Sequence, residues 1–284
     1  NYSVFLNSGS SANLAMIYSL IISNRLKNNK IIVPAVSWVT TVTPAIQFGL
    51  EPILCDCDKD DLGLDVEHLK KLIKEHKPSA IILVHVLGIP NKMNEILGLC
   101  KENDILLIED TCEAMGSEYK NKKLGTFGDM STFSMYFGHH MSTIEGGMIC
   151  TDDEELYNIL LSIRSHGWDR DLPKDKQKEL RKKYGVNDFR ALYTFYYPGF
   201  NLRATDLQAF IGINQLKKID KIIKQRNKNY RYYQRNIIKK GWKIKPQKYS
   251  YVSNFCYPII TENIDKLSKA LIDNNIECRP LICG

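Results

Sequence analysis

The chain has 284 residues, 44% of them hydrophobic and 25% charged, which suits a globular protein with one large domain or a large and a smaller one. No apolar run approaches the roughly 18 residues of a membrane helix, and no basic-then-apolar leader is present, so we expect neither a membrane partner nor secretion. The net charge of +7 arises in residues 214–248, where thirteen Lys and Arg against one acid give +12 and leave −5 elsewhere. A charge run on one helix is more often a solvated face than a binding stripe, so we expect no nucleic-acid partner.

The eight cysteines are scattered along the chain. Cys55 and Cys57 are too close together for a zinc knuckle, and no second pair follows at zinc spacing. We therefore expect no metal site, and free thiols in a reducing cytoplasm. Because the chain begins at Asn1 and stops at Gly284 directly after an apolar run, we also expect it to be a piece of a longer protein.

From Asn1 to about residue 212, short apolar runs alternate with helical patterns. The runs are rich in Ile, Val and Leu and predict strands buried on both faces at 30–36, 51–57, 79–86, 104–110, 130–136 and 146–152. Helical patterns occur at 11–26, 38–48, 65–76, 92–103 and 152–165. This alternation predicts an α/β fold with a mostly parallel central sheet and helices on both faces.

The pattern changes after residue 165. Residues 166–200 are first charged and then aromatic, which indicates an excursion over a surface or a site. An amphipathic helix is predicted from 204 to about 240, followed by a strand in "YVSNFCYPII" and a helix and strand in "DKLSKALIDNNIECRPLI". We therefore expect a large domain (1–212), a connecting helix (213–240) and the start of a small α+β domain (241–284).

Two segments of the predicted large domain, together with a tryptophan, could bind an anionic, aromatic ligand. In "NSGSSAN" (7–13), Gly9, Ser10 and Ser11 enter a helix whose first amides form a potential phosphate site, although the segment taken alone favours a simple serine cap. In "LLIEDTCEAMGS" (106–117), Asp110 ends a strand, where a carboxylate can hold a proton on a heteroaromatic nitrogen or merely cap a helix. Trp38 also follows a strand, and its indole could stack on a planar ring or belong to the core.

A third segment, "TFSMYFGHHMSTIEGGM" (132–148), contains two adjacent histidines. A single histidine at a strand end is usually structural. The pair His139 and His140, between a serine and a glycine pair, favours general acid–base chemistry.

Taken in order, these segments resemble the DegT/DnrJ/EryC1/StrS sugar aminotransferase family, fold type I enzymes that use pyridoxal phosphate. The resemblance runs from about Val4 to Gly284 and includes "VPAVSWVTT", "LIEDTCEAMG", "GTFGDMSTFS", "EGG", "RSHGW" and "GFNLRATDLQAFIGINQL". It implies a homodimer with shared active sites. The family's cofactor contacts map onto Gly9, Ser10, Ser11, Trp38, Asp110, Glu113, Ser134 and Asn201.

The resemblance implies a role for each of these positions. The serines and the glycine would hold the cofactor phosphate, Trp38 would stack on the pyridine ring, and Asp110 would keep the ring nitrogen protonated. Glu113 stands where the family commonly has Gln beside the ring hydroxyl. Asn201 would reach the phosphate of the neighbouring subunit.

One position departs from the family's aminotransferases. Their cofactor-linking lysine lies six residues before the Glu of "EGG"; here that position is His139, and no Lys occurs between 124 and 173. The departure resembles the sugar 3-dehydratase branch, which implies a cofactor held non-covalently as pyridoxal or pyridoxamine phosphate. His139 would then be the catalytic base.

The same branch suggests the substrates. "VPAVSW", "HGWDRDLP" and "ECRPL" resemble its members that act on a GDP-linked 4-keto-6-deoxy sugar in deoxysugar and O-antigen biosynthesis. Because residues 151–255 contain no Cys, we expect electrons from L-glutamate rather than from an iron–sulphur centre. Arg170 is a candidate for the glutamate carboxylate, although a surface arginine in a charged loop is nearly as plausible a reading.

Two other functions remain open at this stage. An ordinary aminotransferase would need another lysine to replace the missing one. A non-catalytic ligand-binding protein would have no need to retain Asp110, Trp38 and Ser134. His140 could be a second catalytic group or a residue that orients His139.

Overall fold

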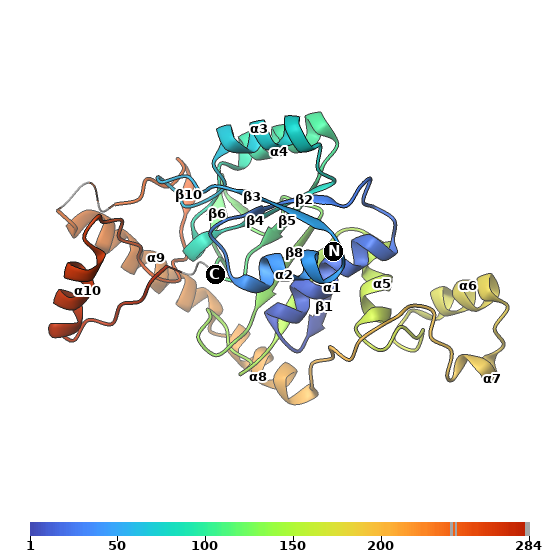
Figure 1. The fold of residues 1–284 in the computed structure, drawn as a ribbon. Coiled ribbons are helices and arrows are strands. Elements are labelled where there is room, and N and C mark those ends of the chain that lie inside the picture. Colours follow the sequence, from blue (N-terminus) through green and yellow to red (C-terminus); the bar gives the residue numbers. More distant parts are fainter. Residues whose placement is uncertain (239–240, 242, 282–284) are drawn as a thin grey trace.

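The computed structural model describes residues 1–238, 241 and 243–281. Its centre is a seven-stranded sheet in the order β1-β9-β8-β5-β4-β2-β3 (Figure 1). The strands are β1 (Tyr2–Leu6), β2 (Lys30–Pro34), β3 (Glu51–Cys55), β4 (Ala80–Val84), β5 (Leu106–Asp110), β8 (Met130–Ser134) and β9 (Gly147–Thr151). All six predicted strands form, and the predicted α/β fold class is confirmed.

The sheet is parallel on one side and antiparallel on the other. β3, β2, β4, β5 and β8 run parallel, whereas β9 is antiparallel to both β8 and β1. The sequence predicted neither β1 nor the antiparallel direction of β9. Because β8 and β9 are antiparallel neighbours, residues 135–146 turn back at the end of β8 and keep His139 at that edge.

Helices cover both faces of the sheet. α1 (Gly9–Ile22), α2 (Val39–Gln47) and α5 (Glu154–Ile163) lie on one face, and α3 (Val66–His76) and α4 (Met93–Asn103) on the other (Figure 1). Neighbouring strand residues alternate between the two cores: Ile82 packs with α1 and α5, while Ile81 packs with α3 and α4. Side chains of Ser8, Asp65 and Asp153 cap α1, α3 and α5.

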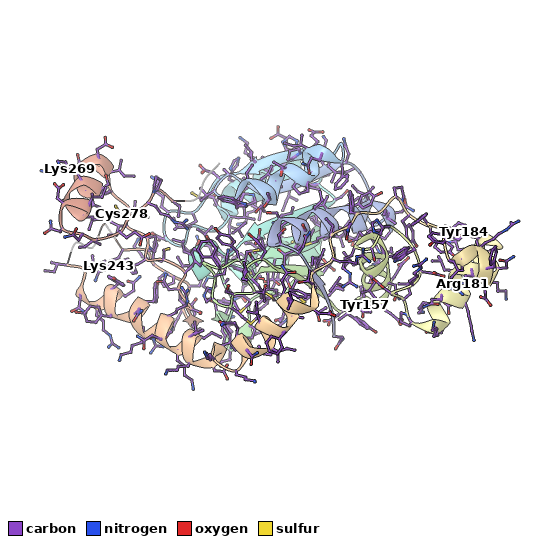
Figure 2. The ribbon with its side chains drawn as sticks, turned by 90° about the horizontal axis from the view of Figure 1, so that it is seen from below. Tyr157, Arg181, Tyr184, Lys243, Lys269 and Cys278 are labelled. Atoms are coloured by element: carbon purple, nitrogen blue, oxygen red, sulfur yellow. The ribbon has the colours of Figure 1, made fainter. Side chains whose placement is uncertain are left out.

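Residues 166–200 leave the body, as predicted, but they contain two helices that the sequence analysis missed. α6 (Lys174–Tyr184) and α7 (Asp188–Ala191) lie at one end of the molecule, where Figure 2 labels Arg181 and Tyr184. Arg181 anchors this segment through ion pairs with Asp169 (2.6 Å) and Asp188 (2.8 Å). α6 has charged residues all round and one buried residue, so the apolar periodicity that marks a helix is absent.

The connecting helix is also different from the prediction, because it is two helices. α8 (Asp206–Leu216) begins with a capping box of Thr205 and Gln208, and α9 (Ile219–Asn236) follows after Lys217 and Lys218. None of the described helices is long and apolar enough to cross a membrane.

The C-terminal residues contain less regular structure than predicted. β10 (Ser250–Tyr251) joins β6 (Glu118–Tyr119) and β7 (Lys122–Lys123) in a small sheet, and α10 (Ile264–Asp273) forms as predicted, at the end opposite α6. Two predicted strands are wrong for the residues that the structure describes: "YVSNFCYPII" is a strand only at Tyr251, and no strand follows α10 up to residue 281. Residue 282, the last of the second segment, lies outside the described residues. A third core cluster joins this region to the body near the short helix η1 (Val86–Gly88), through Val84, Leu87, Tyr230, Ile244 and Val252.

Candidate active site

The start of α1 lies directly against the end of β8. The Ser8 Oγ accepts a hydrogen bond from the Ser11 amide at 3.0 Å and so caps the helix. A Cβ atom placed on Gly9 would come within 2.7 Å of the Cβ of Ser134, so only glycine allows this approach. The first amides of a helix have no acceptor within the helix, and beside Ser134 they form a cradle suited to a phosphate.

Asp110 lies at the carboxyl end of β5, one strand away from this cradle. Its buried carboxylate accepts hydrogen bonds from Asn13 Nδ2 of α1 (3.1 Å), Thr41 Oγ1 of α2 (2.8 Å) and the Cys112 amide (3.1 Å). Three donors from three segments fix its orientation. Trp38, just before α2, is 57% exposed and leaves an indole face open at the same edge of the sheet.

The preceding residue, Glu109, faces the other side of β5 and has a structural role. Its carboxylate accepts hydrogen bonds from the amides of Gly125, Phe127 and Gly128 at 2.6–2.8 Å and lies 3.0 Å from His85 Nε2. Burial acts to raise the pKa of Glu109, but the bonds from His85 and the amides outweigh it, and the pKa is lowered. Glu109 therefore holds the loop that leads into β8.

His139 points its ring at the end of β5. Its Nδ1 lies 2.7 Å from the carbonyl oxygen of Cys112. Because a carbonyl can only accept, Nδ1 carries the proton of the neutral ring and Nε2 has a free lone pair. Burial lowers the pKa of His139, which favours this neutral form. The Phe255 ring lies 5.1 Å from the imidazole and covers it.

Glu113 follows the same strand and occupies a distinct position. Its Oε2 accepts the amide of Leu87 at 2.8 Å. Burial raises the pKa of Glu113, and the positive charge of Arg279 opposes that rise. The carboxyl group is thus held at the site in a setting that favours its protonated form more than water does.

Within the part of the chain that the structure describes, Arg170 and Asn201 make no hydrogen bond or ring contact to Asp110 or His139. The Arg170 guanidinium stacks over Trp168 (4.1 Å) and Tyr193 (5.3 Å) and donates to the carbonyl of Leu192. The exposed Asn201 accepts from Arg203 Nε at 3.2 Å. Arg170 packs within the excursion, whereas Asn201 lies where the chain returns to the body, since the next residue, Leu202, accepts the Asn7 amide at 2.9 Å just before α1.

Several groups at the site escaped the sequence analysis. Asn13 and Thr41 lie far from Asp110 in the chain, and the Cys112 carbonyl belongs to the backbone, so no local pattern reveals them. Phe255 lies in a segment predicted to be a strand. The one usable signal was the position of Asn13 one turn after Gly9, on the helix that faces the sheet.

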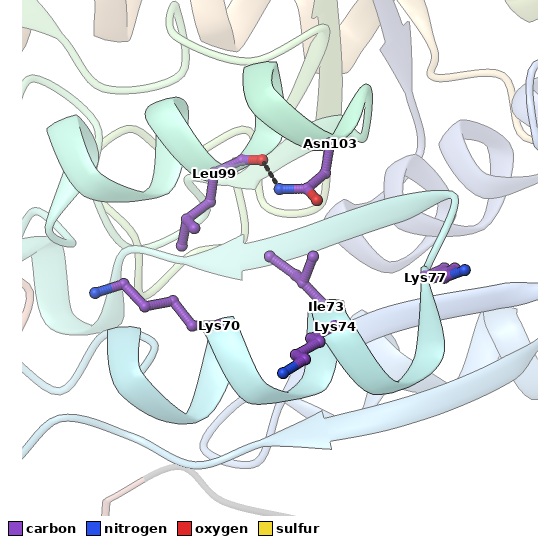
Figure 3. Close-up of a pocket in the computed structure, with 6 residues that line it drawn as sticks. All are labelled: Lys70, Ile73, Lys74, Lys77, Leu99 and Asn103. Carbon is purple, nitrogen blue, oxygen red and sulfur yellow. Dashed lines mark hydrogen bonds between the residues drawn. The ribbon is translucent and has the colours of Figure 1, made fainter.

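A cavity of about 300 Å³ lies elsewhere, between α3 and α4 (Figure 3). Lysines form its rim and Ile73 and Leu99 its floor, and Asn103 Nδ2 donates to the Leu99 carbonyl at 2.9 Å. None of these residues contacts the candidate site, which lies at the carboxyl edge of the sheet. That edge is where open α/β folds bind ligands.

Comparison with known proteins decides the family. The model of the DegT/DnrJ/EryC1/StrS aminotransferase family matches residues 1–282. The chain belongs to this family. It is 40% identical to the GDP-4-keto-6-deoxy-D-mannose 3-dehydratase of Yersinia pseudotuberculosis, over all of this chain and 73% of that protein. It is 30% identical to the GDP-perosamine synthase of Escherichia coli O157:H7, over 99% of this chain and 72% of that protein.

A solved structure of the E. coli GDP-4-keto-6-deoxy-D-mannose 3-dehydratase with bound hydrated PLP has the same fold. It gives a TM-score of 0.90 at 41% identity, covering 100% of this chain and 74% of that one. Other solved structures of a GDP-4-keto-6-deoxymannose 3-dehydratase contain a trapped PLP-glutamate geminal diamine or, in a histidine-to-asparagine variant, bound GDP-perosamine. Homologues of this chain therefore bind pyridoxal phosphate, glutamate and a GDP-sugar.

Proposed function

We propose that this protein is a nucleotide-sugar 3-dehydratase that removes the C3 hydroxyl of a GDP-linked 4-keto-6-deoxy sugar. Its cofactor would be pyridoxamine phosphate, regenerated by L-glutamate. The observation that carries the proposal is His139: it stands where the family's aminotransferases have their lysine, and its Nε2 is free to accept a proton.

The residues at the carboxyl edge of the sheet fit this cofactor. The close approach of Gly9 to Ser134 leaves a cradle that any larger side chain would fill, and Ser10 and Ser11 extend it. The carboxylate of Asp110, held by three donors, would bind the protonated ring nitrogen, and Trp38 would cover the ring face. Glu113 would contact the ring hydroxyl. When bound, the cofactor supplies a pyridine ring that accepts electrons from the reacting carbon.

His139 would move the protons of the reaction. A neutral imidazole with its Nδ1–H held by the Cys112 carbonyl can accept a proton only at Nε2. The same nitrogen can then donate that proton to the departing C3 hydroxyl, so that the group leaves as water. The lowered pKa of His139 keeps the ring unprotonated before the reaction. It also makes the protonated ring a stronger acid once the proton has been accepted.

A second copy of the chain would complete the site. The Arg170 guanidinium packs on aromatic rings of the excursion, and α8 has no buried residue and presents four apolar side chains outward: Leu207, Phe210, Ile213 and Leu216. Exposed apolar stripes of this kind mark interaction surfaces. In a homodimer, Asn201 would bind the partner's cofactor phosphate and Arg170 the glutamate carboxylate.

The decisive experiment is His139→Asn in the full-length protein, supplied with pyridoxamine phosphate, glutamate and GDP-4-keto-6-deoxymannose. We expect C3 deoxygenation to fall by at least about 100-fold, the usual scale for removing a general base. Cofactor binding, followed by its absorbance, should survive. His76→Asn, on α3 away from the site, should behave as the unmodified protein.

Product analysis separates the possible outcomes. A 3-deoxy-4-keto sugar with released ammonia supports the proposal, provided that it disappears in His139→Asn. Retained turnover in that variant would overturn the role of His139. A stable amino sugar from the unmodified protein would instead indicate an aminotransferase.

A further inference from the structure

His140 is a buried histidine that the proposed reaction does not use. Its side chain belongs to a residue that is 2% exposed, and its Nε2 lies 2.9 Å from the carbonyl oxygen of Ser253. Because that oxygen can only accept, Nε2 carries the proton. Nδ1 is buried and has no hydrogen-bond partner among the described residues.

These features argue against proton transfer by His140. Burial first, and then the charge of Arg226, lowers its pKa to about 4, so the ring is neutral at ordinary pH. Its one N–H is already donated to a backbone carbonyl. Its other nitrogen lies in the protein interior and faces no solvent. A group in this state can hold a segment in place more readily than it can exchange protons with a substrate.

The segment that His140 holds is Val252–Phe255, at the entry to the C-terminal region. Its other anchors are side chains and backbone on separate elements: Asn227 Nδ2 to the Val252 carbonyl, Arg226 Nη1 to the Asn254 and Phe255 carbonyls, the Ser253 amide to Ser117 Oγ, and the Phe255 amide to the Leu87 carbonyl, all at 2.9–3.2 Å. His140 alone among these anchors comes from the turn that contains His139.

Phe255, at the end of this segment, contacts both histidines. Its ring lies 5.1 Å from the His139 ring, tilted by 43°, and 6.1 Å from the His140 ring. It therefore covers a face of the His139 imidazole that would otherwise meet water. Burial of that imidazole is the leading cause of its lowered pKa.

We propose that His140 is a positioning residue: it ties the turn of His139 to the backbone at Ser253, so that Phe255 packs on the His139 imidazole and aims Nε2 at the cofactor. The inference rests on the proposed function only for its effect on turnover. Its effect on the His139 ring belongs to the protein alone.

Two substitutions separate tethering from proton transfer. His140→Gln keeps an N–H donor at a similar reach, whereas His140→Leu keeps the bulk and loses the donor. We expect His140→Leu to lower kcat by about 10- to 100-fold, because a misplacement of about 1 Å can cost that much, and His140→Gln to retain most of it. Glutamine as inactive as leucine would overturn the tether, and so would leucine as active as the unmodified protein.

The second readout is the titration of His139 in cofactor-free protein, followed by NMR of ¹³C-labelled histidine. In His140→Leu the pKa of His139 should rise towards its ordinary value, as water reaches a less covered ring. In His140→Gln it should stay lowered. The charged groups that act on His139 are Asp110, Arg226 and Arg279, and all three stay unchanged in both variants.

Phe255→Leu provides an independent test, because leucine covers less of the His139 ring and His140 is unchanged. It should raise the pKa of His139 as well, and an unchanged pKa in this variant and in His140→Leu would overturn the proposal. If the unmodified protein lacks dehydratase activity, the proposed function fails. The titration of His139 would still decide whether His140 positions the turn by its bond to Ser253.

Discussion

The edge of the sheet around Asp110 and the outer surface of α8 are built in opposite ways. At the sheet edge, donors from α1, from α2 and from the strand's own continuation satisfy one buried carboxylate within a single chain. On α8, four large apolar side chains at intervals of three residues face outward, and Phe210 is 65% exposed. The first region is complete in one chain, whereas the second has the composition of a core without a covering layer.

The contrast divides the proposed functional residues into two groups. Those that would bind the cofactor ring lie where the chain makes its own contacts. Those that would bind the phosphate and the glutamate of a partner are Asn201, where the excursion returns to the body, and Arg170, on the excursion itself. A catalytic site divided in this way would require a second copy for turnover but not for folding of the sheet.

The largest expected effect comes from charging the outer surface. Phe210→Asp should abolish the dimer, because an isologous interface receives the charge twice, and turnover should fall by more than about 100-fold as the partner's groups are lost. Tyr232→Asp on α9 is the matched control, since Tyr232 is also 65% exposed. Light scattering gives the mass. A Phe210→Asp dimer of unchanged mass and activity would show that α8 is not the interface.

A smaller effect is expected in the interior of the chain, where the pH dependence of stability depends on the buried His140. His140 has a folded pKa of about 4 against 6.5 when unfolded, so its stabilising contribution is complete above pH 6.5 and is lost as the pH falls towards 4. At about 1.4 kcal/mol for each pKa unit, this loss approaches about 3 kcal/mol. Asp61, whose pKa is raised by burial to about 6, changes in the opposite direction over the same range.

The measurement must therefore compare two proteins. Urea unfolding of the unmodified protein and of His140→Gln at several pH values isolates His140, because the contribution of Asp61 cancels in the difference. The advantage of the unmodified protein should shrink as the pH falls from 6.5 to 4. A difference that stays constant with pH would contradict the closed environment of His140.

The smallest expected effect tests the fit at the cradle. Gly9→Ala introduces a methyl group 2.7 Å from the Ser134 Cβ, and such overpacking costs about 1–3 kcal/mol, so affinity for pyridoxal phosphate should fall by about tenfold or more. Gly98→Ala in α4 meets nothing within 4 Å and should stabilise the helix by up to about 1 kcal/mol. If both variants bound the cofactor with equal affinity, the proposal that Gly9 belongs to the phosphate site would be wrong.

The sequence predicted the parts of this molecule that depend on local patterns. The strands from β2 to β9 of the main sheet are apolar runs and were found, but the prediction that all are buried on both faces is wrong for the edge strand β3, where Glu51 and Leu54 are exposed. Strand direction leaves no such trace, and the antiparallel pairing of β9 and the existence of β1 were missed. α6 escaped because a helix with polar residues all round lacks apolar periodicity.

The candidate site was predictable for similar reasons. Asp110 and the Gly-Ser-Ser segment lie at the ends of predicted elements, and the structure brings them to one edge. The partners that orient them, Asn13, Thr41 and the Cys112 carbonyl, come together only through long-range packing. Phe255 reaches His139 from a segment more than a hundred residues away, in a region where the predicted strand does not form.

Because of the two adjacent carboxylates of β5, a bound cofactor would also report on the structure of the sheet. Glu109 and Asp110 face opposite sides of one strand, so a slip of β5 by a single residue would turn each carboxylate to the opposite face of the sheet. The loop amides before β8 would lose the Glu109 carboxylate that accepts their hydrogen bonds. In the same event, the ring nitrogen of the cofactor would lose the Asp110 carboxylate. The native circular dichroism signal of the bound cofactor would therefore report the register of the central strand. Loss of this signal during unfolding would show when the sheet opens.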